Sequence, residues 1–296
     1  MSSSASPTIL TYAGGIAGVV EAIAIQPLEF IKVRFQLNTG SNASIVQTTR
    51  DVIAEGGFLR LYRGLLPELC GMFPTRSAMY AGNEMAKRIL LSFQGGEEGS
   101  TKKETMGIAG MAGFMSGIAE AVVANPFQII KVRLQSKEHL GKYSNSFDCV
   151  KTVLREEGIA AFSIGIQATI IRNSIWNGVY FTTMFCIKEK TFLLSTNDQS
   201  RLQSTIFSLF TGFIAGVTAT AFNAPFDVLK SRIQGQCPKN VQYTSTLDAF
   251  IKIGRREGIS GLYKGFTPKA MRMGIGGAVA VTTFEAVCEI ARGLEL

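Results

Sequence analysis

The chain repeats one proline-centred segment three times at a fixed spacing. Pro27, Pro126 and Pro225 are spaced by 99 residues, and each is followed by basic residues five and seven positions later. A fixed period of this length is the sequence signature of a repeat architecture. Because the three copies fill nearly all of the 296 residues, the chain is predicted to fold as one domain with pseudo-threefold symmetry.

Glycines recur in the same register on both sides of each proline. A GxxxG pair precedes each proline, a spacing that lets two apolar helices approach closely. These pairs are Gly14–Gly18, Gly113–Gly117 and Gly212–Gly216. A Glu-Gly block follows each proline, at Glu55-Gly56, Glu157-Gly158 and Glu257-Gly258. Each repeat is therefore predicted to contain two long helices joined by a loop and a short surface helix.

These patterns set the expected elements and their bounds. The long helices are predicted at residues 9–37, 67–92, 107–136, 168–193, 204–234 and 267–292, and the short ones near 45–55, 146–156 and 246–256. The chain then divides into a flexible N-terminus (1–8), repeats at 9–93, 105–194 and 204–296, and linkers at 94–104 and 195–203. The proline inside the first long helix of each repeat is expected to kink that helix.

The composition indicates a membrane protein, and with the six long helices predicted above the expected fold class is an all-α membrane protein with six transmembrane helices. Hydrophobic residues make up 46% of the chain and charged residues only 18%, against roughly 25% charged in a soluble domain. The candidate spans nevertheless contain Glu21, Glu29, Lys32 and their counterparts in the other repeats. Charges within membrane helices are tolerated where they face a bundle interior or a wet cavity. The helices are therefore expected to surround a polar interior.

Several classes of function are disfavoured. The net charge is +8, but the basic residues are spread through the repeats, which favours anionic lipid and an anionic solute over nucleic acid. Five cysteines without a CxxC pair indicate free thiols. The single histidine, His139, is predicted in a surface loop. Without a nucleotide-binding glycine loop, a metal-ligand cluster or a Ser/His/Asp set, we expect no catalytic site, no metal and no cofactor.

An acid or amide two residues after each proline and a base five residues after it lie about one helical turn apart on one face. They could form ordinary pairs within each helix. Around a threefold axis, the base of one repeat could instead meet the acid of another. Repetition in register on three helices favours such a ring. Its members would be Glu29, Lys32, Gln128, Lys131, Asp227 and Lys230.

The repeated motif Pro-x-[Asp/Glu]-x-x-[Lys/Arg]-x-[Lys/Arg], with its Glu-Gly and aromatic-basic-Gly blocks, resembles the mitochondrial carrier family from about residue 9 to residue 292. The second repeat departs from it at Gln128 and at Ser163-Ile164. The resemblance implies six tilted helices in the mitochondrial inner membrane, a central cavity and alternating access. It also leads us to expect a multi-pass monomer with the anionic lipid cardiolipin as a partner.

The resemblance further implies two gates. The matrix gate would consist of the pairs Glu29–Lys131, Asp227–Lys32 and Gln128–Lys230, of which the last is at best a hydrogen bond. The cytoplasmic gate would consist of Glu84–Lys188 and Glu285–Lys87. Its third pair is missing, because Phe185 and Cys288 occupy those positions.

The second long helix of each repeat is expected to bind the solute. Counted from Gly64, Gly165 and Gly265, the seventh residue is Gly71, Arg172 or Arg272. Two arginine forks in a wet cavity suit carboxylates, because guanidinium binds them bidentately. The alternative, arginines that extend to lipid head groups, is less favoured at mid-helix. The candidate substrate-binding residues are Gly71, Met72, Thr75, Arg76, Arg172, Asn173, Trp176, Asn177 and Arg272.

Within the family, the strings at 168–172, 176–181 and 226–234 are most similar to the carriers of 2-oxodicarboxylates such as 2-oxoglutarate and 2-oxoadipate. Pro74-Thr75-Arg76 departs from that branch, which usually has Lys-Arg after the proline. A tricarboxylate (citrate-type) carrier, an amino-acid carrier and a non-transporting membrane adaptor therefore stay open as alternatives. The segment 271–277 lacks the arginine run of the ADP/ATP exchangers.

Two further acids occupy equivalent positions in the first two repeats. Glu21 and Glu120 are 99 residues apart, and Ala219 takes the third position. They could counter the charge of the arginines, carry a proton, or pack against polar groups of another helix.

Overall fold

The computed structural model describes residues 7–37, 44–93, 105–194, 201–236 and 241–294. Its long helices are α1 (Pro7–Leu37), α3 (Leu65–Phe93), α4 (Met106–Gln135), α6 (Ile166–Leu194), α7 (Arg201–Gly235) and α9 (Phe266–Leu294). Shorter helices lie between them: α2 (Ile45–Gly56), α5 (Ser146–Glu156), α8 (Thr246–Leu262) and the 3₁₀ helices η1 (Phe58–Tyr62) and η2 (Ile159–Ser163). The predicted all-α architecture is confirmed, and each long helix begins and ends within three residues of its predicted bounds.

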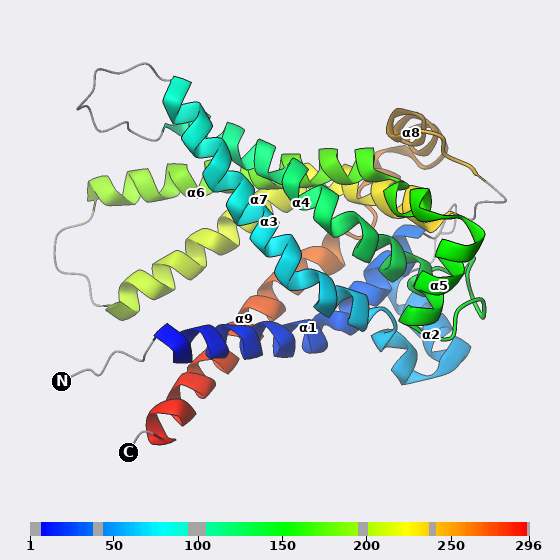
Figure 1. Ribbon diagram of the computed structural model, residues 1–296, viewed down its shortest axis with the longest axis horizontal. Helices are drawn as coiled ribbons and strands as arrows, with labels where there is room; N and C mark the ends of the chain where they lie inside the picture. Colours follow the sequence, from blue (N-terminus) through cyan, green and yellow to red (C-terminus); the bar gives the residue numbers. More distant parts are fainter. Residues whose placement is uncertain (1–6, 38–43, 94–104, 195–200, 237–240, 295–296) are drawn as a thin grey trace.

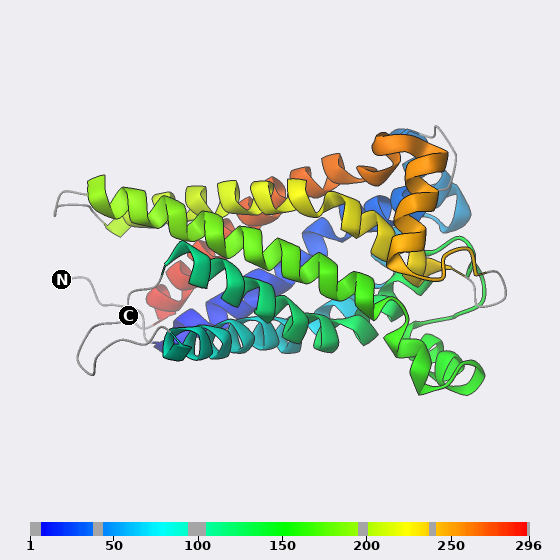
Figure 2. The same ribbon diagram turned by 90° about the horizontal axis from the view of Figure 1, so that it is seen from above.

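The long helices form a closed ring. Along the chain, α1 contacts α3, α3 contacts α4, α4 contacts α6, α6 contacts α7 and α7 contacts α9, and α9 packs back against α1. The short helices α2, α5 and α8 gather at one end of this ring, and α1 begins and α9 ends at the opposite end (Figures 1 and 2). In Figure 1 the long helices fan apart toward that opposite end. The short helices therefore lie at the narrower end of the ring.

The ring carries apolar side chains outside and charges inside. Exposed apolar residues line the outer faces, among them Ile16, Val19 and Ile23 of α1 and Phe114, Ile118 and Val122 of α4. The buried charged residues include Glu29, Lys32, Lys131, Asp227 and Lys230. In the part of the chain that is described, only α4 is both long and apolar enough to qualify as a membrane span on those criteria alone. The gate charges lower the hydropathy of the other long helices, but they face the interior, where charge is tolerated.

Each surface helix is positioned by the same local devices. The side chains of Ser44, Asn145 and Ser245 cap α2, α5 and α8 by accepting a hydrogen bond from the backbone N–H three residues further on. Such caps satisfy a donor that the first helical turn leaves free. One buried face then packs on the first long helix of the repeat, as Val52 does near Phe30 in a shared cluster.

The turn after each surface helix requires glycine. Gly57, Gly158 and Gly258 have φ values of 72°, 75° and 68°, a left-handed region that is costly for residues with a Cβ atom. In the second and third repeats this glycine belongs to the Glu-Gly block, and in the first it is the residue after Gly56. In the third repeat the structure continues α8 across this point, although Gly258 itself is not helical.

Three buried glutamines join the repeats to one another. Gln36 Nε2 donates to the carbonyl of Lys264 at 3.3 Å, and Gln135 Nε2 donates to the carbonyl of Arg63 at 3.2 Å. Gln234 Nε2 donates to Asn125 Oδ1 at 2.9 Å. Each bond connects the end of a first long helix to a different repeat. The three repeats therefore close into one domain, as predicted.

Not all of the GxxxG pairs lie at close contacts between helices. A Cβ at Gly117 would overlap backbone atoms of Ser174, and one at Gly113 would lie 2.7 Å from the carbonyl oxygen of Asn177. A Cβ at Gly18 would reach only Met72 Sδ, at 3.6 Å, and one at Gly14 would meet nothing within 4 Å. The predicted close approach is confirmed for α4 against α6 and is wrong for the first repeat, where no backbone lies near these glycines.

We expect Gly117→Ala to destabilise the protein by about 3 kcal/mol or more, because α4 and α6 must separate to admit the methyl group. Gly14→Ala is the matched control and should leave stability unchanged or slightly raised. The measurement is the thermal midpoint of the purified protein in detergent. Equal midpoints for the two variants would contradict the close α4–α6 contact.

The prediction for His139 is wrong, because its side chain is only 4% exposed. Its ring lies 5.6 Å from that of Tyr143 between centroids. Burial, together with the positive charges of Arg133 and Lys142, lowers the pKa of His139 from 6.5 to about 4. The Lys/Glu/Gly-rich surroundings in sequence concealed this packing.

The buried histidine predicts a loss of stability in mild acid. Between pH 6.5 and about 4 the unfolded chain binds a proton at His139 that the folded chain does not, so stability falls as the pH is lowered through this window. We expect His139→Gln to flatten that part of the profile of thermal midpoint against pH. An unchanged slope between pH 7 and pH 4.5 would refute the assignment.

Candidate functional site

A cavity of about 330 Å³ lies inside the ring. Six of the nine candidate substrate-binding residues line it: Gly71, Met72, Thr75, Arg76, Arg172 and Arg272. The two acids Glu21 and Glu120 line it as well. Its volume is at the lower end of small-molecule sites, which span about 300–1,000 Å³. The cavity therefore brings arginines from three different helices, together with the further acids Glu29 and Glu68, around a space of small-molecule size.

Two of the charge pairs predicted for the matrix gate are formed at one end of this cavity. Lys32 Nζ lies 3.1 Å from Asp227 Oδ2, and Lys131 Nζ lies 3.2 Å from Glu29 Oε2. Both ion pairs join different repeats. The two predicted charge pairs of this gate are thus present, and the ring is formed rather than a set of pairs within single helices.

Asp227 is the most heavily used acid of the gate. Besides Lys32, it accepts from Lys269 Nζ at 2.7 Å and from Arg172 Nε at 2.7 Å. These cations come from α1, α9 and α6, and Asp227 itself belongs to α7. One buried carboxylate therefore connects four helices, and removing it would leave three cations without their closest acid.

The predicted contact between Gln128 and Lys230 is not present. Gln128 Oε1 is buried without a hydrogen-bond partner, and none of the gate ion pairs in the described residues involves Lys230. Lys131, by contrast, has two acids: besides Glu29 it pairs with Glu68, whose Oε2 atom lies 2.6 Å from Lys131 Nζ. A neutral amide offers a lysine less attraction than a carboxylate does, so the third gate position stays open.

Sequence reasoning missed Glu68 and Lys269. Both lie four residues after the glycine that opens the second long helix, Gly64 or Gly265, and Thr169 is the equivalent residue after Gly165. Glu68 and Lys269 lie about one turn before Gly71 and Arg272, which were predicted to bind the solute, and on the same helix face. Indexing the fourth residue as well as the seventh would have found them.

The arginines predicted to bind substrate also contact the gate. Arg272 Nε lies 3.0 Å from Glu29 Oε1, and Arg172 Nε lies 2.7 Å from Asp227 Oδ1. Asn173 is buried beside the site and accepts from Arg172 Nη1 at 2.6 Å, so it orients Arg172. The two arginines therefore link the substrate cavity to the closed gate below it.

The predictions for the remaining residues of α6 need correction. Asn173, Asn177 and Trp176 do not line the described cavity. Asn177 donates to Glu120 Oε2 at 2.8 Å, and Trp176 Nε1 donates to Thr220 Oγ1 at 3.4 Å. Asn177 is thus hydrogen-bonded to α4 and Trp176 to α7, whereas Arg172 lines the cavity.

The two additional acids lie near the arginines. Arg272 and Arg76 exert the strongest electrostatic effects on Glu21 among charged groups. Glu120 acts electrostatically on Arg172 and is held by Asn177. Both acids therefore lie where they can balance positive charge in the cavity.

Glu84 and Lys188, predicted to pair in the cytoplasmic gate, are not paired with each other in the structure. Glu84 pairs with Arg88 of its own helix at 3.0 Å, and both Glu84 and Lys188 are exposed. The predicted pair Glu84–Lys188 is wrong for this state, because the helices diverge at this end (Figure 1). The predicted pair Glu285–Lys87 cannot be described, since the side chain of Glu285 lies outside the described residues.

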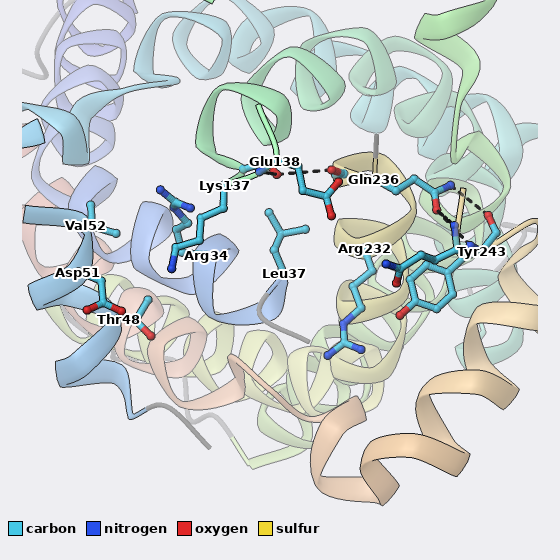
Figure 3. A pocket seen from close by; sticks show the side chains of 13 residues that line it. Arg34, Leu37, Thr48, Asp51, Val52, Lys137, Glu138, Arg232, Gln236 and Tyr243 are labelled. Atoms are coloured by element: carbon cyan, nitrogen blue, oxygen red, sulfur yellow. Dashed lines mark hydrogen bonds between the residues drawn. The ribbon is translucent and has the colours of Figure 1, made fainter. Parts of the chain in front are cut away.

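A second cavity, of about 210 Å³, lies beyond the matrix gate and is less suited to bind the solute. Figure 3 shows Leu37 between Arg34 and Arg232 in this space. Both arginines already have partners, because Arg34 pairs with Glu55 and Arg232 binds Glu257 through two nitrogens at 2.5 and 2.8 Å. Burial alone would raise the pKa of Glu257, but hydrogen bonds from Arg232 and Lys264 lower it to about 2. These charges hold the surface helices to the ring.

Comparison with known proteins agrees with the repeats. The family model described as "Mitochondrial carrier protein" matches residues 3–94, 102–193 and 202–293. A relative from Dictyostelium discoideum, named "Probable mitochondrial 2-oxodicarboxylate carrier", is 36% identical, with 95% of this chain and 90% of the relative covered. The mouse "Mitochondrial 2-oxodicarboxylate carrier" is 35% identical over 92% of this chain and 91% of its own length. "Mitochondrial citrate transporter D" of Aspergillus niger is 32% identical over 95% and 93%.

The gate geometry predicts a ranking of variants. Asp227→Asn should lower stability by about 3–5 kcal/mol, since it leaves buried cations uncompensated. Lys32→Ala should cost less, because Asp227 keeps Lys269 and Arg172. Glu84→Gln, which removes an exposed pair, should change stability by less than about 1 kcal/mol. Thermal midpoints in detergent test the order, and equal effects of Asp227→Asn and Lys32→Ala would exclude Asp227 as the shared acid.

Proposed function

This chain belongs to the mitochondrial carrier family, and on that premise we propose that it exchanges 2-oxodicarboxylates, such as 2-oxoglutarate and 2-oxoadipate, by alternating access. As a family member it is a multi-pass transporter of the mitochondrial inner membrane. The observation that carries the proposal is that Arg172 and Arg272 both line one cavity. Two guanidinium groups from two different helices, α6 and α9, suit a solute with two carboxylates.

The roles of individual residues follow from this proposal. Arg172 and Arg272 bind carboxylates, and Arg76 supplies a third positive contact from α3. Gly71 and Met72 line the cavity beside them, and Thr75 offers a hydroxyl group. Glu21 and Glu120 act as counter-charges while the cavity is empty. The interaction of both arginines with gate acids supports a coupling between binding and gate movement, since a bound carboxylate competes for the same donors.

A tricarboxylate carrier is the second candidate, because the cavity has a third arginine and one relative is named as a citrate transporter. An amino-acid carrier is a third candidate, because the acids Glu21 and Glu120 also line the cavity and suit an ammonium group. A non-transporting adaptor would have no need of the ion pairs that close the gate. Transport is therefore favoured over an adaptor role.

The finer parts of the proposal concern assembly and lipid. We infer a monomer, because α9 packs back on α1 and one chain encloses the cavity by itself. Cardiolipin is the proposed lipid partner, since a net charge of +8 suits an anionic head group.

The decisive experiment uses purified protein in liposomes that are preloaded with 2-oxoglutarate. External labelled 2-oxoglutarate, 2-oxoadipate, citrate, a monocarboxylate and ATP are then compared. We expect exchange of the two 2-oxodicarboxylates and none of ATP. Preferential exchange of citrate would favour the tricarboxylate reading, and exchange of none of these anions would refute the proposal.

In the same liposomes, Arg172→Ala and Arg272→Ala should each lower kcat/KM for 2-oxoglutarate by about 100-fold or more. Each removes one charge-assisted contact from a partly desolvated site, which costs about 3 kcal/mol. Arg88→Ala is the matched control, because Arg88 is exposed and outside the cavity. Near-normal exchange by either cavity variant would overturn the assignment of the site.

A further inference from the structure

Lys230 is a gate cation without an acid. Its side chain is buried, with 8% exposed, and in the described part of the chain no gate ion pair includes it. The charged groups that act on it are Arg172, Lys32 and Lys131, which repel it, and Asp227, which attracts it. A buried charge with so little compensation is costly unless an anion joins it.

The space beside Lys230 has the volume and the charge to hold such an anion. A cavity of about 120 Å³ lies at the level of the gate. Its charged lining consists of the cations Lys32, Lys131, Arg172, Lys230, Lys269 and Arg272 and of the acids Glu29, Glu68 and Asp227. Positive groups outnumber carboxylates by three in this set, so the space attracts an anion rather than a second cation.

This gate cavity is continuous in its lining with the larger substrate cavity. Five residues line both spaces: Glu29, Glu68, Gln128, Arg172 and Arg272. Arg172 and Arg272 therefore face both the substrate and Lys230's surroundings. These arginines can hold one end of an elongated dianion while its other end extends toward Lys230.

The amide of Gln128 faces the same cavity and leaves the acid position empty. Its Oε1 atom has no hydrogen-bond partner although it is buried. The equivalent positions of the other repeats carry Glu29 and Asp227, whose carboxylates form ion pairs with Lys131 and Lys32. The third repeat-to-repeat connection thus lacks one carboxylate.

We propose that Lys230 binds one carboxylate of the transported dianion, which takes the place of the acid that Gln128 does not supply. This inference rests on the proposed function, because it requires a cargo with at least two carboxylates. Lys230 then contacts substrate rather than only closing the gate. Gln128 sets the specificity, since an acid at that position would compete with the cargo.

Gln128→Glu tests the competition directly. The new carboxylate should occupy Lys230 and raise KM for 2-oxoglutarate about tenfold in exchange assays. Gln128→Met, which has a similar length and no charge, is the reference for loss of the amide alone, and its KM should rise severalfold less than that of Gln128→Glu. If the KM of Gln128→Glu does not exceed that of Gln128→Met while the wild type exchanges normally, the inference is wrong.

A binding measurement separates the cargo from a small inorganic anion. The thermal midpoint of each purified protein is followed as 2-oxoglutarate, chloride or phosphate is added in detergent. We expect 2-oxoglutarate to stabilise the wild type and Gln128→Met, and to stabilise Gln128→Glu much less. A response to chloride or phosphate that Gln128→Glu abolishes, with the response to 2-oxoglutarate unchanged, would assign Lys230 to an inorganic ion and overturn the proposal.

The failure of this inference differs from failure of the proposed function. If the wild type exchanges citrate rather than 2-oxoglutarate, the substrate class is wrong, but the same pair of variants can be assayed with citrate. A larger increase in KM for citrate in Gln128→Glu than in Gln128→Met would support the role of Lys230. An equal KM in both variants would refute that role, whichever anion is carried.

Discussion

The closed state depends on buried carboxylates that hold lysines and arginines from different repeats. Asp227 contacts Lys32, Lys269 and Arg172, and these four residues lie on four helices. Buried ion pairs gain little net stability once the loss of hydration is counted, but a missing partner is expensive. This asymmetry suits a gate, because its closed form is specific and is not so stable that it cannot open.

The arrangement of polarity follows from the same constraint. Charges that would be costly in lipid face inward, where they meet one another and the cavity, while apolar side chains such as Ile118 and Val122 face outward. The glutamines Gln36, Gln135 and Gln234 then lock each repeat to another beneath the charges. A single repeat contains only part of every such contact, so the interior exists only when all three are assembled.

The periodicity of the sequence predicted much of this structure. The features that it did not predict depend on how the helices pack against one another. The spacing of prolines and glycines placed the long helices and the ring of charges, and the family resemblance gave the pairs Glu29–Lys131 and Asp227–Lys32. The spacing did not reveal Glu68 or Lys269, because these residues lie outside the proline motif. It also assigned Asn177 and Trp176 to the cavity, although neighbours on α4 and α7 take their hydrogen bonds. The burial of His139 was missed because the packing of a loop on a helix leaves no period in the sequence.

The glycine contacts also bear on how such a ring can move. A Cβ at Gly82 would lie 3.0 Å from Ala119 Cβ, which brings α3 close to α4, and Gly117 brings α4 against the backbone of α6. Comparable backbone contact is not made at Gly14 or Gly18. Helices α3, α4 and α6 thus pack closely as one group, and α1 packs closely on α9. Contact is sparser between α1 and α3 and between α7 and α9. Although the sequence repeats threefold, the packing does not, so these two seams are where the ring opens most easily.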